Sequence, residues 1–278
     1  MLQPGRYNTL RVVKEVEFGI YLDGGEHGEI LMPLKYVPQG TAIDDEIEAF
    51  VYYDSEDRLI ATTEEPYIMV GEFAFLETKS VNRVGAFLDW GITAKDLLVP
   101  FAEQRAPMRE GGVYLVYAYI DKASGRIAAS AKVDKFLDNE PPAYHINQPV
   151  DLLVVQETEL GYKVIVDNKH WGMLYRNEIF SPVEPGDYLT GYVRKVRDDD
   201  KLDIALQPAG YKKNVDDLSL KIVDALTAAG GFLPYGDKSD AAVIAEQFGC
   251  SKKNFKKTIG ALYKAHRIVI LPEGIKLV

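Results

Sequence analysis

Aromatic side chains recur beside glycines at two places in the chain, and their spacing suits contact with flat ligands. Phe18 and Tyr21 lie three residues apart around Gly19, and Phe87 takes the place of Tyr21 in a second stretch, where Val84 replaces Phe18. Rings on an open strand face can stack on unpaired bases, at roughly 1–3 kcal/mol per base. The alternative is that these rings belong to a core or to ordinary strand surface. Phe18, Tyr21 and Phe87 are therefore candidate base contacts.

Two arginines lie at matching positions, each just after an acidic turn. Arg58 follows the turn that begins at Asp54, and Arg126 follows the turn that begins at Asp121. A guanidinium group in such a place can bind a phosphate or stack on a base. The alternative is an ion pair with Asp54 or Asp121 inside the turn. Arg58 and Arg126 are candidate RNA contacts on the first interpretation.

A third stretch, over residues 150–206, combines more basic residues and rings than the first two. Leu160 and Lys163 stand at the places of Phe18 and Tyr21. A solvated strand edge is the alternative, because lysine and arginine also protect exposed edges. The candidate RNA contacts of this stretch are Tyr162, Lys163, Trp171, Tyr175, Arg176, Arg194, Lys195 and Arg197, with Tyr192 nearby.

The segment from Ser251 to Arg267 is the most basic part of the chain and contains no acidic residue. Phe255 and Ile259 are spaced to face inward from a helix, which leaves the lysines outside. In helix-turn-helix proteins this helix enters a groove of the nucleic acid, and only Ser251 and Asn254 nearby are suited to base edges. A solvated basic face on an interaction domain is the alternative. The candidate contacts are Lys252, Lys253, Lys256, Lys257 and Arg267.

Three stretches with one order of predicted strands would position these residues. Each has five short strands, over residues 9–63, 72–130 and 150–206, rich in alternating Val, Ile, Leu, Tyr and Phe. A glycine in each second strand fits a bulge or a sharp bend. Five strands in about 65 residues match the size of an OB-type barrel. We predict a mainly β protein with three tandem OB-fold barrels.

The pattern changes to helical spacing after Leu206. Helices are expected over 217–229, over 240–248 with Ser239 as cap, and over 252 to about 266 with Ser251 as cap. A short hairpin over 268–278 follows, which completes a winged helix-turn-helix of the α+β type. With Pro-rich joints at 64–66 and 139–142, the predicted domains are barrels at 1–65, 66–142 and 143–211 and a winged helix at 212–278.

Charge is distributed unevenly over these predicted domains. The 278-residue chain has a net charge of −10, which excludes a uniformly basic nucleic-acid binder. The net charges of the four domains in order are −9, −1, −4 and +4. Phosphates would be repelled by the first barrel unless local geometry prevails, so it is expected to be the weakest RNA surface and a candidate protein-contact module.

Composition also limits the function classes. With 47% hydrophobic and 27% charged residues the chain is ordinary globular protein. Cys250 is the only cysteine and the four histidines are dispersed, which makes a zinc site improbable. Asp198–Asp200 is placed at a hairpin tip, where acids are common turn residues. No catalytic motif, long apolar span or basic leader is found. We expect a cytoplasmic protein that is not an enzyme, with no cofactor, no metal and no membrane partner.

The motifs resemble a known family. The segments Phe18–Leu22 and Val84–Asp89, with the fifth strands downstream, resemble the RNA-binding repeat named after the largest small-subunit ribosomal protein. Three such barrels followed by a basic winged helix, with the segments Leu160–Val164 and His170–Ile179, resemble the bacterial conserved virulence factor B family. This resemblance covers essentially the whole chain.

The resemblance implies a cytoplasmic, non-enzymatic RNA-binding protein that acts on gene expression after transcription. Its ligand-facing pattern has two rings on the second strand, a histidine on the third, and an Asp and an Arg around the last turn. Matching residues are Phe18, Tyr21, Asp54 and Arg58 in the first barrel and Phe87, Asp121 and Arg126 in the second. At the histidine position, Tyr175 offers a ring in the third barrel, whereas Leu31 and Leu98 stand there in the others.

The leading hypothesis is a binder of single-stranded RNA with little sequence preference, in which barrels two and three and the basic helix make most contacts. Two alternatives stay open at this stage. One is a DNA-binding regulator that reads duplex DNA through the winged helix. The other is an interaction scaffold that docks on ribosomes or on RNA-processing proteins through the acidic first barrel.

Overall fold

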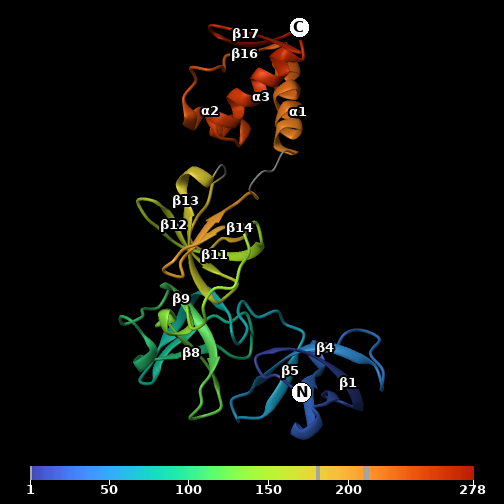
Figure 1. Ribbon diagram of the computed structural model, residues 1–278. Coiled ribbons are helices and arrows are strands. Elements are labelled where there is room, and N and C mark those ends of the chain that lie inside the picture. Colours follow the sequence, from blue (N-terminus) through green and yellow to red (C-terminus); the bar gives the residue numbers. More distant parts are fainter. Residues whose placement is uncertain (1, 180–181, 209–212) are drawn as a thin grey trace. The chain divides into compact units, whose positions relative to one another are not determined.

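The structure is a computed structural model that describes residues 2–179, 182–208 and 213–278 (Figure 1). The chain forms two compact units, one up to Asn139 and one from Glu140 onward. The first contains two five-stranded sheets, and the second contains a third such sheet and a helical region with a small sheet. The predicted fold class, three OB-like barrels followed by a winged helix, is confirmed.

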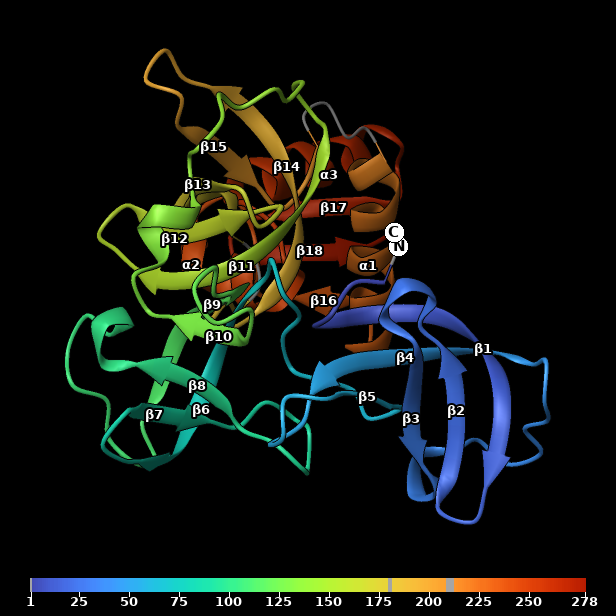
Figure 2. The same ribbon diagram turned by 90° about the horizontal axis from the view of Figure 1, so that it is seen from below.

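The first barrel is closed, with the strand order β1-β2-β3-β5-β4. Alternate residues such as Val12, Leu22 and Ile30 point into its core and are buried, as the period-two pattern predicts. Figure 2 shows β1, β2 and β3 side by side. The strands are β1 (Arg6–Val16), β2 (Gly19–Asp23), β3 (Glu29–Pro33), β4 (Glu46–Tyr53) and β5 (Leu59–Thr62).

The second barrel repeats this arrangement as a five-stranded sheet in the order β10-β9-β6-β7-β8. Its strands are β6 (Phe73–Val81), β7 (Gly85–Leu88), β8 (Leu97–Pro100), β9 (Val113–Ile120) and β10 (Ile127–Ser130). The hydrophobic core of this barrel does not stop at its own strands. It continues into Phe50 and Tyr52 on β4 of the first barrel, so the two barrels share one buried cluster.

The third barrel is closed in the order β11-β12-β13-β15-β14, and its own core includes Val154, Val164 and Ile204. The strands are β11 (Pro149–Glu157), β12 (Gly161–Val166), β13 (His170–Tyr175), β14 (Tyr188–Val196) and β15 (Leu202–Ala205).

The three glycines expected to mark a bulge or a sharp bend do not lie at the bulges. The register shifts lie in the first strand of each barrel, as between Val12 and Lys14, and not in the second strand. Each glycine begins its second strand against the end of the third. A Cβ at Gly19, Gly85 or Gly161 would lie 2.1–2.3 Å from a carbonyl oxygen of that third strand. The glycine therefore permits close pairing of the second and third strands, while the bulge bends the first strand.

The C-terminal region has three helices and a three-stranded sheet in the order β16-β18-β17. Its short strand β16 pairs with β18 and was not expected from the sequence. The elements are α1 (Lys213–Ala228), β16 (Phe232–Leu233), α2 (Ala241–Phe248), α3 (Lys252–Lys264), β17 (Ile268–Leu271) and β18 (Gly274–Leu277).

The helix caps agree with the sequence at α3 but not at α2. Ser251 accepts a hydrogen bond from the Asn254 amide, as predicted for the start of α3. The predicted cap Ser239 is wrong for α2, because Asp240 accepts the bond from the Ala242 amide instead. Ser239 accepts from the amide of Gly236, within the preceding turn. Gly249 ends α2 in the left-handed conformation, with φ of 63°.

The predicted domain limits fall between the sheets at 65/66 and at 142/143. The limit at 211/212 lies outside the described residues. The division into four domains remains a prediction.

Candidate nucleic-acid interface

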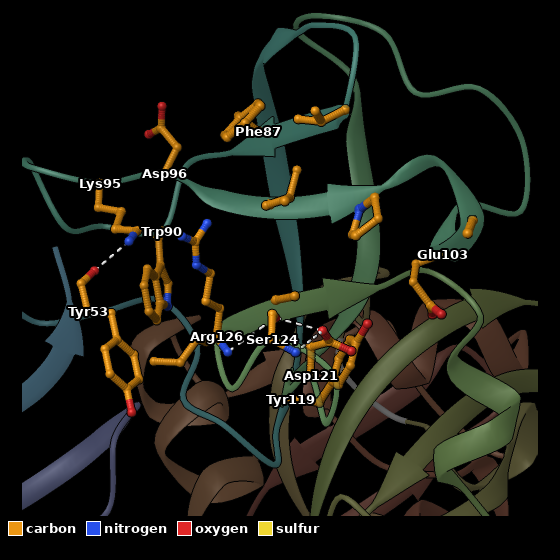
Figure 3. Close-up of a pocket in the computed structure, with 16 residues that line it drawn as sticks. Tyr53, Phe87, Trp90, Lys95, Asp96, Glu103, Tyr119, Asp121, Ser124 and Arg126 are labelled. Carbon is orange, nitrogen blue, oxygen red and sulfur yellow. Dashed lines mark hydrogen bonds between the residues drawn. The ribbon is translucent and has the colours of Figure 1, made fainter. Parts of the chain in front are cut away.

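A groove of about 580 Å³ lies on the open face of β7, β8 and β10 in the second barrel (Figure 3). Phe87 on β7 lies opposite Leu98 on β8, and Ile127 and Ala128 of β10 continue the apolar wall. Phe87 is half-buried, so part of its ring stays accessible. The sequence candidates Phe87 and Arg126 are thus brought together in one groove.

Lys95 stands at the end of this groove that faces the first barrel. Its Nζ donates to the main-chain carbonyl oxygens of Tyr53 and Asp54, the latter at 2.9 Å, and Figure 3 shows it beside Tyr53. Burial of the ammonium group lowers the pKa of Lys95, and the positive charge of Arg126 lowers it further. Two cationic side chains therefore share one partly desolvated corner.

Arg126 forms its ion pair with an unexpected partner. Its guanidinium contacts the carboxylate of Asp57, which lies in the β4–β5 turn of the first barrel. The alternative expected from the sequence, a pair with Asp121 inside its own turn, is wrong. Asp121 instead accepts hydrogen bonds from the amide and the hydroxyl of Ser124, at 3.0 and 2.7 Å. These bonds stabilise the turn and leave Arg126 to reach across to Asp57.

The other acids that line the groove are matched by nearby cations. Asp96 lies 3.3 Å from the Nζ of Lys79, and Glu103 forms an ion pair with Lys135. Both acids therefore have basic partners. Because each of these carboxylates is close to a cation, it repels an anion in the groove less than an unpaired carboxylate would.

The first barrel holds its candidate residues on the corresponding face. Phe18 is 58% exposed and meets Tyr21 edge to face, with centroids 6.4 Å apart. Lys14 lies over the Tyr21 ring, 5.4 Å from its centroid. Arg58 forms ion pairs with Asp54 at 2.8 Å and with Glu56 at 2.9 Å. The pairing inside the turn that the sequence allowed for Arg58 is therefore present.

The third barrel satisfies its cations internally. The Nζ of Lys163 lies 3.5 Å from the centroid of the Trp171 ring. Arg197 donates to Asp203 at 2.8 Å and also contacts the hydroxyl of Tyr175. Arg176 pairs with Glu157 at 3.0 Å, and Arg194 with Glu178 at 3.1 Å. Lys195 is exposed on β14.

Tyr162 is separated from the other candidates of this barrel. It alternates with Lys163 along β12 and packs against the core cluster that contains Val164. The ring therefore packs against the core of the barrel. This is the structural role that aromatic residues on strands often have.

The strand register also corrects the place of Tyr175. Tyr175 pairs with Gly161, as Pro33 pairs with Gly19 and Pro100 with Gly85. Met173, not Tyr175, holds the position of Leu31 and Leu98, because it pairs with Lys163. The ring of Tyr175 is thus two residues further along the same face of β13, since residues two apart share a side of a strand.

Helix α3 carries its lysines outward. Phe255 and Ile259 are buried, as predicted, whereas Lys253, Lys256 and Lys257 are exposed and Lys252 is half-buried. Lys256 pairs with Asp237 at 3.0 Å. Arg267 is exposed just beyond the end of the helix, and Asn254 is exposed in the first turn.

The sequence interpretation missed Tyr53, Trp90 and Lys95, which border the groove. None of them belongs to the ligand-facing positions of the single-barrel pattern. Tyr53 comes from the first barrel, whereas Trp90 and Lys95 follow β7 of the second, and the packing of the two barrels brings them together. Comparison of the sequence repeats does not predict such packing.

The described part of the chain, residues 2–179, 182–208 and 213–278, shows no group of three or more metal-ligating side chains. In the same ranges, no helix has the length and apolar character needed to cross a membrane.

Two family models match the chain at its two ends. Residues 4–64 match the S1 domain, and residues 220–277 match the CvfB-like winged helix domain. Both are domain types that bind nucleic acids, so the class defined by the fold is that of multidomain nucleic-acid-binding proteins.

Relatives extend the match over most of the chain. Uncharacterized protein YitL from Bacillus subtilis (strain 168) is 27% identical over 96% of this chain and 91% of its own length. Conserved virulence factor B from Staphylococcus aureus (strain MRSA252) is 25% identical over 83% of this chain and 80% of its own. The chain is thus similar to conserved virulence factor B over most of its length, and its C-terminal part matches the winged helix model named after that family.

A solved structure aligns with the chain as well. It is described as a multidomain protein with nucleic acid binding domains from Streptococcus pneumoniae TIGR4. The alignment covers 99% of this chain and 98% of that one, with 22% identity and a TM-score of 0.41.

Proposed function

We propose that this protein binds single-stranded RNA with little sequence preference and acts, without catalysis, on gene expression after transcription in the cytoplasm. The observation that carries the proposal is the groove of the second barrel, where the ring of Phe87 and the cations Lys95 and Arg126 line one cavity. A base can stack on the ring while its phosphate meets the cations.

The size and chemistry of the groove suit an unpaired nucleotide better than a duplex. A volume of about 580 Å³ lies in the range of small-ligand sites. Its wall is apolar and formed by short strands, and a paired base does not expose its face to such a wall. Single-strand binding by OB-type barrels rests on this combination of stacking and positive charge.

Helix α3 supplies the second part of the proposed surface. In its N-terminal half the exposed lysines offer positive charge with no exposed ring between them, which favours phosphate contacts over reading of bases; the exposed ring of Tyr263 lies near the other end of the helix. Charge contacts of this kind give affinity that falls steeply with salt.

The test is fluorescence anisotropy with the full chain and a labelled oligouridylate of about 20 nucleotides, repeated between roughly 50 and 300 mM salt. We expect binding at low salt and a linear fall of log affinity with log salt. Absence of binding at low salt would refute the proposal.

Duplex DNA is the second candidate ligand, and it is favoured by one observation. The N-terminal half of α3 is exposed and basic, as a helix that enters a major groove must be. A labelled DNA duplex of matched length in the same titration decides between the two. Tighter binding of the duplex than of the single-stranded RNA would replace the RNA proposal with a DNA-binding one.

A further inference from the structure

We propose that Lys95 and Arg126 form a phosphate subsite at the junction of the first two barrels, and that the carboxylate of Asp57 occupies it until an RNA phosphate displaces it. This inference rests on the proposed function and adds a residue of the first barrel to the binding site of the second. We call this group, Asp57, Lys95 and Arg126, the junction subsite.

Lys95 is held in place by the first barrel. Two of the three protons that its ammonium group can donate are directed to the carbonyl oxygens of Tyr53 and Asp54. Main-chain carbonyls are fixed by the strand pairing of β4 and β5, so the ammonium group has a defined position. A long side chain that is already ordered loses little further freedom when it meets an anion.

Arg126, the residue just before β10, approaches the same corner. The charges of Lys95 and Arg126 act on each other, and those of Asp57 and Asp54 offset them. Both cations line the same groove, and Asp57 supplies a negative charge there through its ion pair with Arg126. The site is therefore already shaped for an oxyanion, and the carboxylate stands in for the phosphate oxygens that would replace it.

The ion pair is weak enough to be exchanged. The side chains of Arg126 and Asp57 are 60% and 49% exposed. Pairs that are this open to water contribute little to stability. The groove with Phe87 begins beside them, so a base on the ring brings its phosphate to this corner. An acidic peptide would meet the same cations, but it would fill the wall of the groove only if an aromatic side chain lay next to its carboxylates.

The decisive variant is Asp57→Asn. Asp57 has a positive φ of 61°, which asparagine adopts with little strain, so the turn is kept while the negative charge is removed. Asp44→Asn is the matched control. Asp44 also belongs to the first barrel, also has a positive φ, of 74°, and also pairs with an arginine, Arg11, at 3.1 Å.

We expect Asp57→Asn to tighten binding of the labelled oligouridylate by about two- to fivefold at low salt, the range set by the strength of exposed ion pairs. Asp44→Asn should change it by less than about 1.5-fold, because its partner Arg11 does not line the groove, whereas Arg126 does. The gain from Asp57→Asn should disappear in an Arg126→Gln background, since its origin is the release of Arg126.

Each other outcome overturns the inference. Equal gains in Asp57→Asn and Asp44→Asn would mean that only the overall charge matters. A gain that persists in the Arg126→Gln background would separate Asp57 from Arg126. Unchanged affinity in Asp57→Asn would show that Asp57 is not part of the site. The proposed function would still stand, provided that the unaltered chain binds RNA. Failure of the unaltered chain to bind RNA would refute both.

Discussion

The groove of the second barrel and the helix α3 offer an RNA strand two different kinds of contact. The groove combines the partly exposed rings of Phe87, Tyr53 and Tyr119 with two cations. Of its three acids, Asp96 and Glu103 are matched by Lys79 and Lys135. Helix α3 has exposed lysines, and between Ser251 and Arg267 the chain contains no acid at all. The groove offers rings on which a base can stack, whereas the N-terminal half of the helix offers mainly charge for the backbone.

The groove and α3 should therefore affect RNA binding in ways that can be measured separately. Counter-ion release follows the number of neutralised phosphates, so the salt dependence of binding should come mainly from α3. Stacking depends weakly on salt, so changes in the groove should alter affinity without altering that dependence.

Charge reversal of Lys252, Lys253, Lys256 and Lys257 to glutamate should have the largest effect. We expect RNA affinity at low salt to fall by about 100-fold and the slope of log affinity against log salt to flatten by about 3, since single strands give about 0.7 per phosphate. Anisotropy titrations across salt measure both quantities. Reversal of Lys221, Lys238 and Lys276, exposed on the same domain but off α3, is the control. If the control reversal lowers RNA affinity as much per charge as the α3 reversal does, α3 is not a specific RNA-binding surface.

Replacement of Phe87 by alanine should weaken RNA binding by about tenfold, because one stacked base is worth roughly 1–3 kcal/mol. The salt slope should stay unchanged. Phe101→Ala is the matched control, since Phe101 is 51% exposed on the same barrel and does not line the groove. Equal losses in both variants, measured by anisotropy on samples with the same circular dichroism, would contradict a specific stacking role for Phe87.

Replacement of Ser251 by alanine should reduce the free energy of unfolding of the C-terminal domain by about 1 kcal/mol, because the amide of Asn254 loses its cap. Hydrogen exchange of the α3 amides measures this loss. Ser219→Ala, inside α1, should not reproduce it. RNA affinity should be retained where the domain stays folded, and a large loss there would mean that Ser251 itself contacts the ligand.

Replacement of Lys163 by glutamine should have the smallest effect, at most about twofold on RNA affinity. Its ammonium group already lies on the ring of Trp171, so an incoming phosphate gains little from it. Lys169→Gln, an exposed change on the same barrel, sets the background. A loss of tenfold in Lys163→Gln alone would make the third barrel a principal binding surface and would break the proposed division between groove and helix.

The repeat pattern predicted the barrels well, because strand periodicity and turn residues are local properties. The strand predicted over 188–196 coincides with β14, and the start of α3 follows from a serine in the right place. The glycines at 19, 85 and 161 were located correctly and interpreted as bulges or sharp bends; the bulges lie in the neighbouring first strands, since a sequence does not reveal which of two paired strands carries the bulge.

The site was less accessible to sequence reasoning, because its partners come from distant parts of the chain. Arg126 was considered only against the acid of its own turn, and its actual partner Asp57 is 69 residues away. Lys95 has no counterpart in the repeat pattern and gains its place from carbonyls of another barrel. Tyr162 was grouped with Lys163 although neighbours on a strand point to opposite sides.

The buried cluster around Trp90 has a consequence for anyone who divides the chain into pieces. Trp90 meets Phe50 and Tyr52 of the first barrel edge to face, with ring centroids 5.5 and 6.3 Å away, and its indole donates to the Ile68 carbonyl at 2.7 Å. A cut at the Pro-rich joint would expose Phe50 and Tyr52, which are almost wholly buried in the full chain. The isolated first barrel should therefore be prone to self-association, and the shortest well-behaved N-terminal fragment should end near Asn139.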